Sequence, residues 1–349
     1  MPATNEPRTP EIGSGPVLAK NVSVTKHPEG ARPDAMKVLN NLYAADMFVD
    51  HYAGEVACVE GIGWLGWTGR CWEPGDAPAR EKVKQLSRNL TQAGWEAVSD
   101  GRKTPGKRLA GLGSRVADRP DAILRLAESD PQIRFGPDDL DRHDHLLNVK
   151  NGTLDLTTGE LLSHDPSDLL TKVAGAGYLP DAPRPTFERF LTTVLPDKDV
   201  RAYVKRIAGY MLAAGNAERI LPVFYGVGRN GKTVLVEILL EIMGDYGIKT
   251  PVSTFLARRS GGPTNDLARL RGARLISASE FEEGARTNIA LVKEVTGDGK
   301  ITARFLHKEF IEFRLSGTAL LDSNHMPWVG CWTGRLGPPP HHPLRGPHP

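Results

Sequence analysis

The fold is decided by one stretch of the sequence, Leu221-Pro222-Val223-Phe224-Tyr225-Gly226-Val227-Gly228-Arg229-Asn230-Gly231-Lys232-Thr233. Its apolar start predicts a buried strand, and Gly226–Thr233 match the Walker A pattern Gly-x4-Gly-Lys-Thr. The apolar residues 234–243 then predict a helix that ends at Gly244. A strand, a glycine-rich loop and a helix in this order predict an α/β fold built around a phosphate-binding loop.

The chemistry of this loop follows from its residue types. Glycine permits the backbone angles and the close approach that a concave nest of N–H groups around phosphate requires. Lys232 would bridge the β- and γ-phosphates, and the Thr233 hydroxyl would ligate Mg²⁺. The predicted cofactors are therefore ATP and Mg²⁺, and the structural alternative is a glycine turn that only caps a core helix. The predicted nucleotide-binding residues are Gly226, Val227, Gly228, Arg229, Asn230, Gly231, Lys232 and Thr233.

Composition limits the classes of protein that the chain can belong to. Its 349 residues are 40% hydrophobic and 25% charged, and 44 Lys and Arg against 42 Asp and Glu give a net charge of +2. These values are typical of a soluble globular protein, and any contact with DNA must be local. Three cysteines are too few for a disulfide framework, and no signal peptide or apolar run of about 18 residues is present. We therefore expect a cytoplasmic protein with no membrane partner.

The first half of the chain predicts a flexible leader followed by mixed α and β structure. Residues 1–34 have no apolar period, and 35–53 predict a helix. A tight hairpin is expected over 64–72, and a mainly helical segment over 79–129, interrupted by a basic glycine-rich loop at 101–113. We expect that loop to be solvated, with phosphate contact as the less favoured alternative. The inner side of the first helix is expected to hold Met36, Val38, Leu39, Leu42 and Met47.

A second β signal and a linker precede the phosphate-binding loop. Residues 145–156 predict a hairpin with the two-residue turn Asn151-Gly152, and Thr158-Gly159 predicts a further turn. Prolines at 180–185 suggest a linker, and residues 187–195 and 200–214 predict helices.

Two strands beyond the loop end in polar residues that suit ATP hydrolysis. Leu275–Ser279 predict a strand followed by Glu280, a candidate Walker B acid for Mg²⁺ and for the attacking water, with Glu282 and Glu283 as nearby alternatives. Residues 313–321 predict a third strand, and Asn324 follows it at a position that could sense the γ-phosphate. The alternatives are an exposed acid at a strand end and an ordinary Asn-x-x-Pro turn.

Between these strands, basic and aromatic residues alternate after a helix that ends at Gly297-Asp298-Gly299. Such a segment could track a single-stranded DNA backbone, although Glu294, Asp298 and Glu309 offset most of its positive charge. The candidate DNA-binding residues are Lys300, Arg304, His307 and Lys308.

Taken in order, these motifs resemble the superfamily 3 helicases, specifically the phage- and plasmid-type DNA primase/helicase family with its poxvirus relatives. The resemblance rests on the Walker A loop, on Arg274–Glu280, on Thr296–Arg304 and on Ser323–Pro327, and Asn148–Leu156 with Thr158–Glu160 resemble the domain that precedes the motor. It implies an AAA+-like P-loop ATPase core over 186–329, preceded by a smaller α+β domain over 35–185. It also implies a homo-oligomeric ring, usually a hexamer, around single-stranded DNA, with a separate primase as a candidate partner.

Two departures from the family pattern bear on activity. No primase domain precedes residue 40, and the family's segment with an arginine finger is replaced by a Pro- and Gly-rich tail over 330–349, in which Arg335 is the arginine placed near the finger position. We expect a truncated or frameshifted end. The predicted function is an ATP-dependent DNA helicase motor for phage, prophage or plasmid replication. The alternatives are an ATP- and DNA-binding remnant with little hydrolysis and a small-molecule P-loop kinase that uses Arg258, Arg259, Arg269, Arg271 or Arg274.

Overall fold

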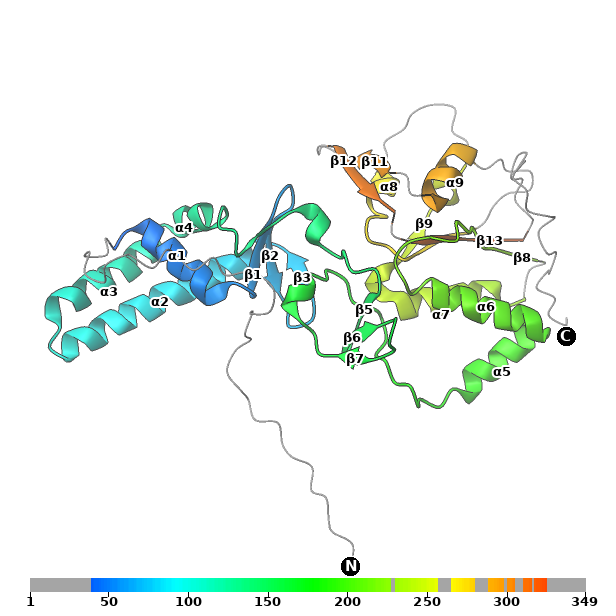
Figure 1. Cartoon of the computed structure of the whole chain (residues 1–349), viewed down its shortest axis with the longest axis horizontal. Helices are drawn as coiled ribbons and strands as arrows, with labels where there is room; N and C mark the ends of the chain where they lie inside the picture. Colours follow the sequence, from blue (N-terminus) through cyan, green and yellow to red (C-terminus); the bar gives the residue numbers. More distant parts are fainter. Residues whose placement is uncertain are drawn as a thin grey trace, which may run out of the picture. The chain divides into compact units, whose positions relative to one another are not determined.

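The computed structural model describes residues 39–226, 230–256, 265–279, 288–297, 300–304, 310–315 and 317–324. By their contacts, these residues form two compact units (Figure 1). The first runs to Trp67 and resumes over Glu73–Pro137, and the second holds Thr68–Trp72 and the described residues from Asp138 onward. The proline-rich stretch 180–185 therefore lies within the second unit, and the domain boundaries predicted from the sequence stay a prediction.

The first unit combines four helices with a small sheet. The sheet has the order β3-β2-β1-β4, with β1 antiparallel to β2 and parallel to β4. The tight hairpin expected over 64–72 is present as β2 and β3. The helices are α1 (Asn41–Tyr52), α2 (Ala77–Ser99), α3 (Lys103–Asp118) and α4 (Pro120–Ala127), and the strands are β1 (Val56–Val59), β2 (Gly63–Trp67), β3 (Trp72–Pro74) and β4 (Arg134–Phe135).

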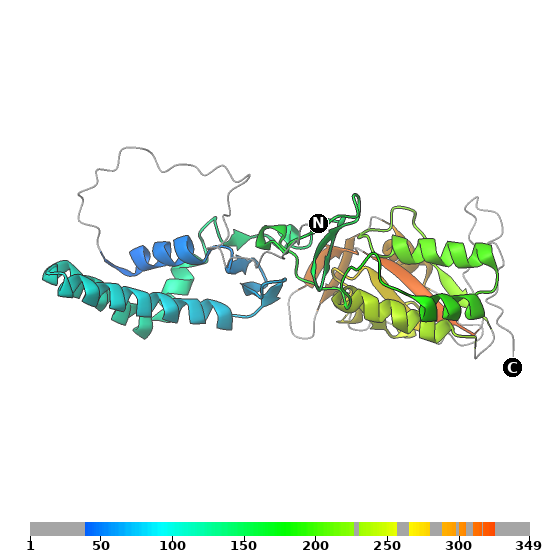
Figure 2. The ribbon, with the colours of Figure 1, turned by 90° about the horizontal axis from the view of Figure 1, so that it is seen from below.

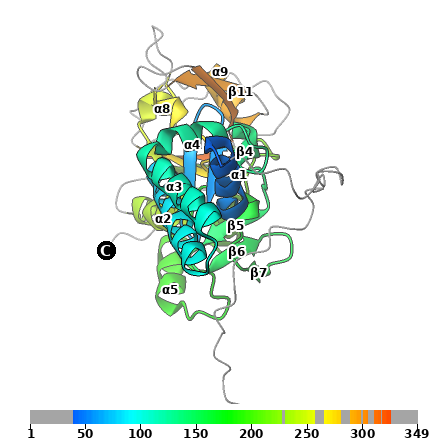
Figure 3. The same ribbon diagram turned by 90° about the vertical axis from the view of Figure 1, so that its left-hand side faces the viewer.

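Helices α2 and α3 form a hairpin and lie side by side along their lengths (Figures 1 and 3). Their contact is a seam of small residues, because a Cβ on Gly94 would lie 2.4 Å from the Ala110 nitrogen and one on Gly106 would lie 2.5 Å from the Gly94 oxygen. The Ser87 hydroxyl also donates to the Gly113 oxygen at 2.8 Å. The interruption expected over 101–113 is present but is confined to residues 100–102, because Gly106 and Gly113 lie in a helix at its contact with α2 and not in a loop.

Helix α1 begins later than the sequence suggests and turns another face inward. Asn40 caps it by accepting a hydrogen bond from the Tyr43 nitrogen at 3.0 Å. Leu42, which was expected on the inner side, is 56% exposed. The buried residues on its inner side are instead Ala44, Ala45, Phe48, Val49 and Tyr52. Met36 and Val38 lie outside the described residues.

The second unit is built on a parallel sheet with the order β8-β13-β10-β9. Figure 2 shows this unit, with its sheet and the helices beside it, from a second side. All three neighbouring pairs are parallel, so the carboxyl ends of the strands share one edge. The strands are β8 (Val223–Tyr225), β9 (Gly247–Thr250), β10 (Leu275–Ser279) and β13 (Thr318–Ser323), and the helices are α5 (Pro185–Val194), α6 (Lys198–Tyr210), α7 (Lys232–Met243), α8 (Asn265–Ala268) and α9 (Ile289–Thr296). The strand–loop–helix unit expected from the sequence is present as β8 and α7.

Both faces of this sheet are covered, and alternate residues of each strand serve the two faces. Leu275 and Leu320 pack with α5, α6 and α7 in one core cluster. Ile276 and Leu321 pack with α9 residues in another. A strand that is buried on both faces has a continuous run of apolar residues in its sequence, such as residues 319–321.

Two smaller antiparallel sheets complete the second unit, and each corrects a detail of the sequence analysis. Strands β5 (Leu146–Val149), β6 (Gly152–Asp155) and β7 (Leu161–Leu162) form one sheet, and β11 (Lys300–Arg304) and β12 (Phe310–Arg314) form the other. Val149 pairs with Gly152, so the turn is Lys150-Asn151 and lies one residue earlier than expected. The strand predicted over 313–321 divides between β12 and β13.

Candidate functional site

The candidate site lies at the carboxyl edge of the parallel sheet, between β8 and β13. Ser323 of β13 pairs with Tyr225 of β8. The residues that follow these two strands, Gly226 and Asn324, therefore leave the sheet side by side. In open α/β sheets, ligands bind outside the carboxyl ends of the strands. The topology thus brings the first residue of the Walker A loop next to the predicted sensor.

Helix α7 begins directly beyond the loop, at Lys232, and Gly231 is its N-cap. Gly231 has a φ of +80°, which disfavours any side chain, and an added Cβ would lie 2.4 Å from Val194 Cγ1 of α5. Two independent constraints thus require glycine at this position. The chain can turn from the loop into the helix here because the residue carries no Cβ.

The Lys232 side chain folds back over the loop. It is only 5% exposed. Its Nζ donates to the Gly226 oxygen at 2.8 Å and to Asn230 Oδ1 at 3.0 Å, and it has a longer contact of 3.4 Å with Asn324 Oδ1. The ammonium therefore joins the start of the loop, its middle and the end of β13. Three predicted site residues, Gly226, Asn230 and Asn324, thus contact the Nζ atom of a fourth, Lys232.

The electrostatics of Lys232 suit an anion. Burial lowers the pKa of its ammonium, and the Asp322 carboxylate opposes that shift. No carboxylate of the described residues forms an ion pair with it within 4.0 Å, and its contacts are to neutral oxygens. A buried cation in this state gains most from a negatively charged ligand. A nucleotide phosphate is such a ligand.

Asp322 is a residue that the sequence analysis did not assign. It is 5% exposed and lies on β13 two residues before Asn324, opposite Ser279 of β10. An acid directly after the apolar run 319–321 was the available signal. Its charge contributes to the potential at Lys232.

Of the other predicted site residues, the structure describes some and not others. Thr233 is exposed at the start of α7, as a hydroxyl that ligates Mg²⁺ needs to be. Glu280 follows β10 directly but lies outside the described residues. The same holds for three residues of the loop, Val227, Gly228 and Arg229. The roles predicted for all of these residues stay predictions.

The candidate DNA-binding segment is described only in its backbone. β11 and β12 form an antiparallel ribbon in which Lys300 pairs with Arg314 and Arg304 pairs with Phe310. His307 and Lys308 lie outside the described residues, as does Arg335. Contact of this segment with DNA stays a prediction.

Arg274 is a second buried cation of the same sheet, and it is surrounded by groups of the protein core. It is 2% exposed and lies at the amino end of β10. Its Nη1 donates to the Leu212 oxygen at 2.7 Å, and its Nη2 donates to the Leu146 oxygen at 2.5 Å. Its guanidinium carbon lies 4.6 Å from the centre of the Tyr246 ring. These contacts assign Arg274 to the core.

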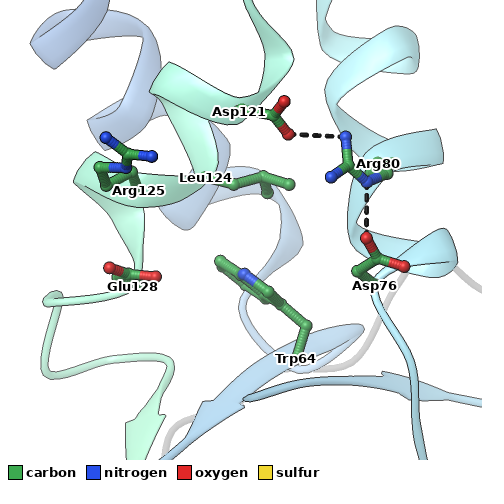
Figure 4. Close-up of a pocket in the computed structure, with 7 residues that line it drawn as sticks. All are labelled: Trp64, Asp76, Arg80, Asp121, Leu124, Arg125 and Glu128. Atoms are coloured by element: carbon green, nitrogen blue, oxygen red, sulfur yellow. Dashed lines mark hydrogen bonds and ion pairs between the residues drawn. The ribbon is translucent and has the colours of Figure 1, made fainter.

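The first unit contains a shallow pocket of about 290 Å³ (Figure 4). Arg80 bridges two carboxylates at its wall, Asp76 at 2.7 Å and Asp121 at 2.6 Å, and so ties the start of α2 to α4. Trp64 and Leu124 provide its apolar surface. The predicted site residues do not line it. The remaining residues that line the pocket are Arg125 and Glu128.

Comparison with known proteins relates the chain to replication proteins of large DNA viruses. Residues 45–196 match the family described as D5 N terminal like. This match overlaps the domain predicted over 35–185. A protein of Acanthamoeba polyphaga mimivirus named "Putative helicase" is 29% identical over 204 residues, which cover 55% of this chain and 21% of that protein.

Two further relatives carry similar names. A "Putative primase" of African swine fever virus is 26% identical over 212 residues, 58% of this chain and 22% of that protein. A "Putative helicase" of Invertebrate iridescent virus 3 is 30% identical over 199 residues, 54% of this chain and 21% of that protein. The chain thus spans about a fifth of the length of these relatives.

Among solved structures, the chain is similar to the C-terminal region of NrS-1. One such structure is 13% identical, covers 46% of this chain and 43% of the other, and has a TM-score of 0.32. A TM-score this low does not establish a common fold. Within the part of the chain that the structure describes, no helix has the length and apolar character needed to cross a bilayer.

Proposed function

We propose that the chain is the ATP-dependent motor of a DNA helicase that acts in replication of a phage, prophage or plasmid. The observation that carries the proposal is the meeting of Lys232, Gly226 and Asn324 at the edge shared by β8 and β13. A loop, a cation and an amide at this edge suit the terminal phosphates of ATP. The names of the viral relatives support a role in replication.

Each residue of the site has a role in this proposal. Lys232 binds the β- and γ-phosphates, and Thr233 ligates Mg²⁺. Asn324 senses the γ-phosphate, and Glu280 ligates Mg²⁺ and polarises the attacking water. The strand order supports these roles, because β13, which leads to Asn324, lies between β8 and β10, which lead to the loop and to Glu280. The same strand order supports the proposal of an AAA+-like superfamily 3 core.

The motor would act on single-stranded DNA. We place the contact on the ribbon of β11 and β12, through Lys300 and Arg304 with His307 and Lys308. Binding there would be independent of sequence and sensitive to salt. The active form would be a homo-oligomeric ring, usually a hexamer, and a separate primase is a candidate partner.

The test is to measure magnesium-ATP binding by calorimetry, and then hydrolysis with and without poly(dT), on the purified full chain. Hydrolysis that poly(dT) stimulates is the expected result. Binding of magnesium-ATP with almost no hydrolysis would instead favour the ATP- and DNA-binding remnant, since a missing arginine finger costs about 10³–10⁵ in rate. Absence of magnesium-ATP binding would contradict both the motor and the ATP- and DNA-binding remnant.

A small-molecule kinase is less well supported than a motor. A kinase lid needs arginines that can reach the phosphates, and Arg274 is 2% exposed and bonded to core carbonyls. Arg258 and Arg259 lie outside the described residues. Transfer of labelled phosphate to an added small acceptor, instead of to water, would favour the kinase.

A further inference from the structure

The outward face of α3 carries a row of cations that the proposed motor does not use. Its exposed basic residues, in chain order, are Lys103, Lys107, Arg108 and Arg115, and the acid of the helix is Asp118 at its far end. The opposite face is fixed against α2 by the glycine seam, so this face points outward. The chain as a whole has a net charge of only +2, which makes the row a strong local departure.

The neighbouring helix shows what basic residues do when they serve the fold. Every lysine and arginine of α2 forms an ion pair: Arg80 with Asp76 and Asp121, Lys82 with Glu55, and Lys84 and Arg88 with Glu81. On α3, none of the four basic side chains forms an ion pair with a carboxylate of the described residues. Arg115 donates to a neutral acceptor, the Leu39 oxygen, at 2.7 Å.

The charges at the start of α3 do not help the helix to form. Its first turn holds Lys103 and no acid, although negative charge is what stabilises the amino end of a helix. Repulsion between Lys103 and Lys107, four residues apart, is also unfavourable. A row of cations with these local costs requires a reason outside the helix, and an anionic partner provides one.

We propose that the outward face of α3 binds the sugar–phosphate backbone of double-stranded DNA without regard to sequence. Lys103 and Arg115 are twelve residues apart, which spans about 18 Å of helix. Duplex DNA carries a phosphate about every 3.4 Å along each strand, so the row spans roughly five phosphates. The face has no aromatic residue on which unpaired bases could stack, and single-strand binders rely on such stacking. The partner is therefore a duplex.

The experiment compares two double variants of the full chain by fluorescence anisotropy with labelled duplex DNA, at salt concentrations from 50 to 200 mM, roughly the range in which phosphate contacts weaken. Lys107→Gln with Arg108→Gln removes two cations of the row. Lys84→Gln with Arg88→Gln is the matched control, because it removes one lysine and one arginine that are exposed but ion-paired on α2. Gln is nearly as good a helix former as Lys or Arg, so both variants should keep the helix.

We expect the α3 variant to bind duplex DNA more weakly than the original chain. The slope of log K against log salt should become less steep by about 1.8, because two phosphate contacts are lost and each contributes about 0.9. The control should leave the slope unchanged. Equal effects of the two variants, or no effect of either, would overturn the proposal. A loss confined to single-stranded DNA, or to an acidic protein used as competitor, would also overturn it.

This test is independent of the proposed motor. The measurements are made without nucleotide, and the α3 variant should retain its affinity for magnesium-ATP. If the full chain fails to bind magnesium-ATP but keeps the difference between the two variants, the motor proposal is wrong and the α3 proposal stands. The reverse result would overturn the α3 proposal alone.

Discussion

The two edges of the parallel sheet each bury a cation, and they bury it in different ways. At the amino edge, the donors of Arg274 are used by the Leu212 and Leu146 oxygens, and its face is covered by Tyr246. At the carboxyl edge, Lys232 contacts the loop oxygens and Asn324, which is itself exposed. The two residues are almost equally buried, since Arg274 is 2% exposed and Lys232 is 5% exposed. The difference lies in the surroundings, since Arg274 bonds core carbonyls under an aromatic ring and Lys232 lies at the strand ends beside an exposed amide.

This comparison separates stability from function. Burial lowers the pKa of both side chains, so their surroundings distinguish them. Arg274 bonds two carbonyl oxygens of the core, which its removal would leave unpaired. Lys232 lies beside an exposed amide at the strand ends, where a ligand can reach it. The two sites should therefore respond to mutation in opposite ways, one in activity and the other in stability.

The largest expected effect is at Lys232. Lys232→Ala should lower ATP turnover by about 10³-fold or more, because it removes the cation that contacts the transferred phosphate. The free energy of unfolding should change little, since the acceptors of Lys232 are partly exposed or exposed and can bond water in its place. Steady-state ATPase assays and urea denaturation measure the two quantities.

The control for Lys232→Ala is Lys249→Ala, which removes an exposed lysine from β9 of the same sheet. It should leave turnover unchanged. Unchanged turnover in Lys232→Ala would exclude this site as the ATPase centre.

Arg274 should give the opposite pattern. Arg274→Met leaves the Leu212 and Leu146 oxygens without their donors and should lower the free energy of unfolding by about 3–4 kcal/mol. The variant that remains folded should bind magnesium-ATP as before. Chemical denaturation and calorimetry measure the two effects.

Arg206→Met is a matched control for Arg274→Met. Arg206 is exposed and lies 6.0 Å from the Tyr203 ring, so its loss should cost less than about 1 kcal/mol. Equal losses at both arginines would show that the core contacts of Arg274 contribute nothing.

The sequence predicted the carboxyl edge better than the amino edge. The Walker A pattern, its strand and its helix were all found, because a glycine-rich loop and its flanking apolar runs are local signals. Arg274 was considered only as a lid residue. Its partners are 62 and 128 residues away in the chain, and no local pattern reveals them.

The first unit shows the same limit. The glycines of α3 indicated a loop because glycine disfavours an isolated helix. Gly106 and Gly113 instead lie in a helix where α2 approaches to within a distance that a Cβ would block. Leu42 was expected inside from the apolar pattern, whereas the face of α1 that holds Ala44, Ala45 and Phe48 packs inward. Packing between segments decided both cases.

A smaller effect is expected at Gly231, which sharpens the view of the carboxyl edge. Gly231→Ala combines a φ of +80° with a Cβ 2.4 Å from Val194 Cγ1, and should cost about 2–3 kcal/mol. Gly159→Ala is the control, because its φ is +73° and nothing lies within 4 Å of its added Cβ. It should cost about 1 kcal/mol, the backbone contribution alone.

A second variant separates the two contributions at Gly231. Val194→Ala combined with Gly231→Ala should relieve the collision, so that the pair costs less than the sum of the two single changes. Urea denaturation of the four proteins completes this cycle. Strict additivity would mean that Val194 does not restrict the start of α7.

The smallest expected effect is the pH dependence of stability that Lys232 confers. Its pKa in the folded protein lies below the ordinary value of 10.5, with burial as the main cause. Between these two values the unfolded chain binds more protons than the folded chain, so the contribution of Lys232 to the free energy of unfolding rises with pH. Below that window both states are protonated, and the cost of burying the charge is present in full.

Lys232→Met removes this titration, so the difference in unfolding free energy between the original chain and the variant should shift in favour of the original chain as pH rises toward 10.5. Lys232→Arg should show no such rise of its own, because an arginine stays protonated throughout this range. Denaturation at a series of pH values measures the difference. A difference that stays flat would mean that Lys232 is hydrated like a surface lysine, and the view of the carboxyl edge as the site of a buried cation would then be wrong.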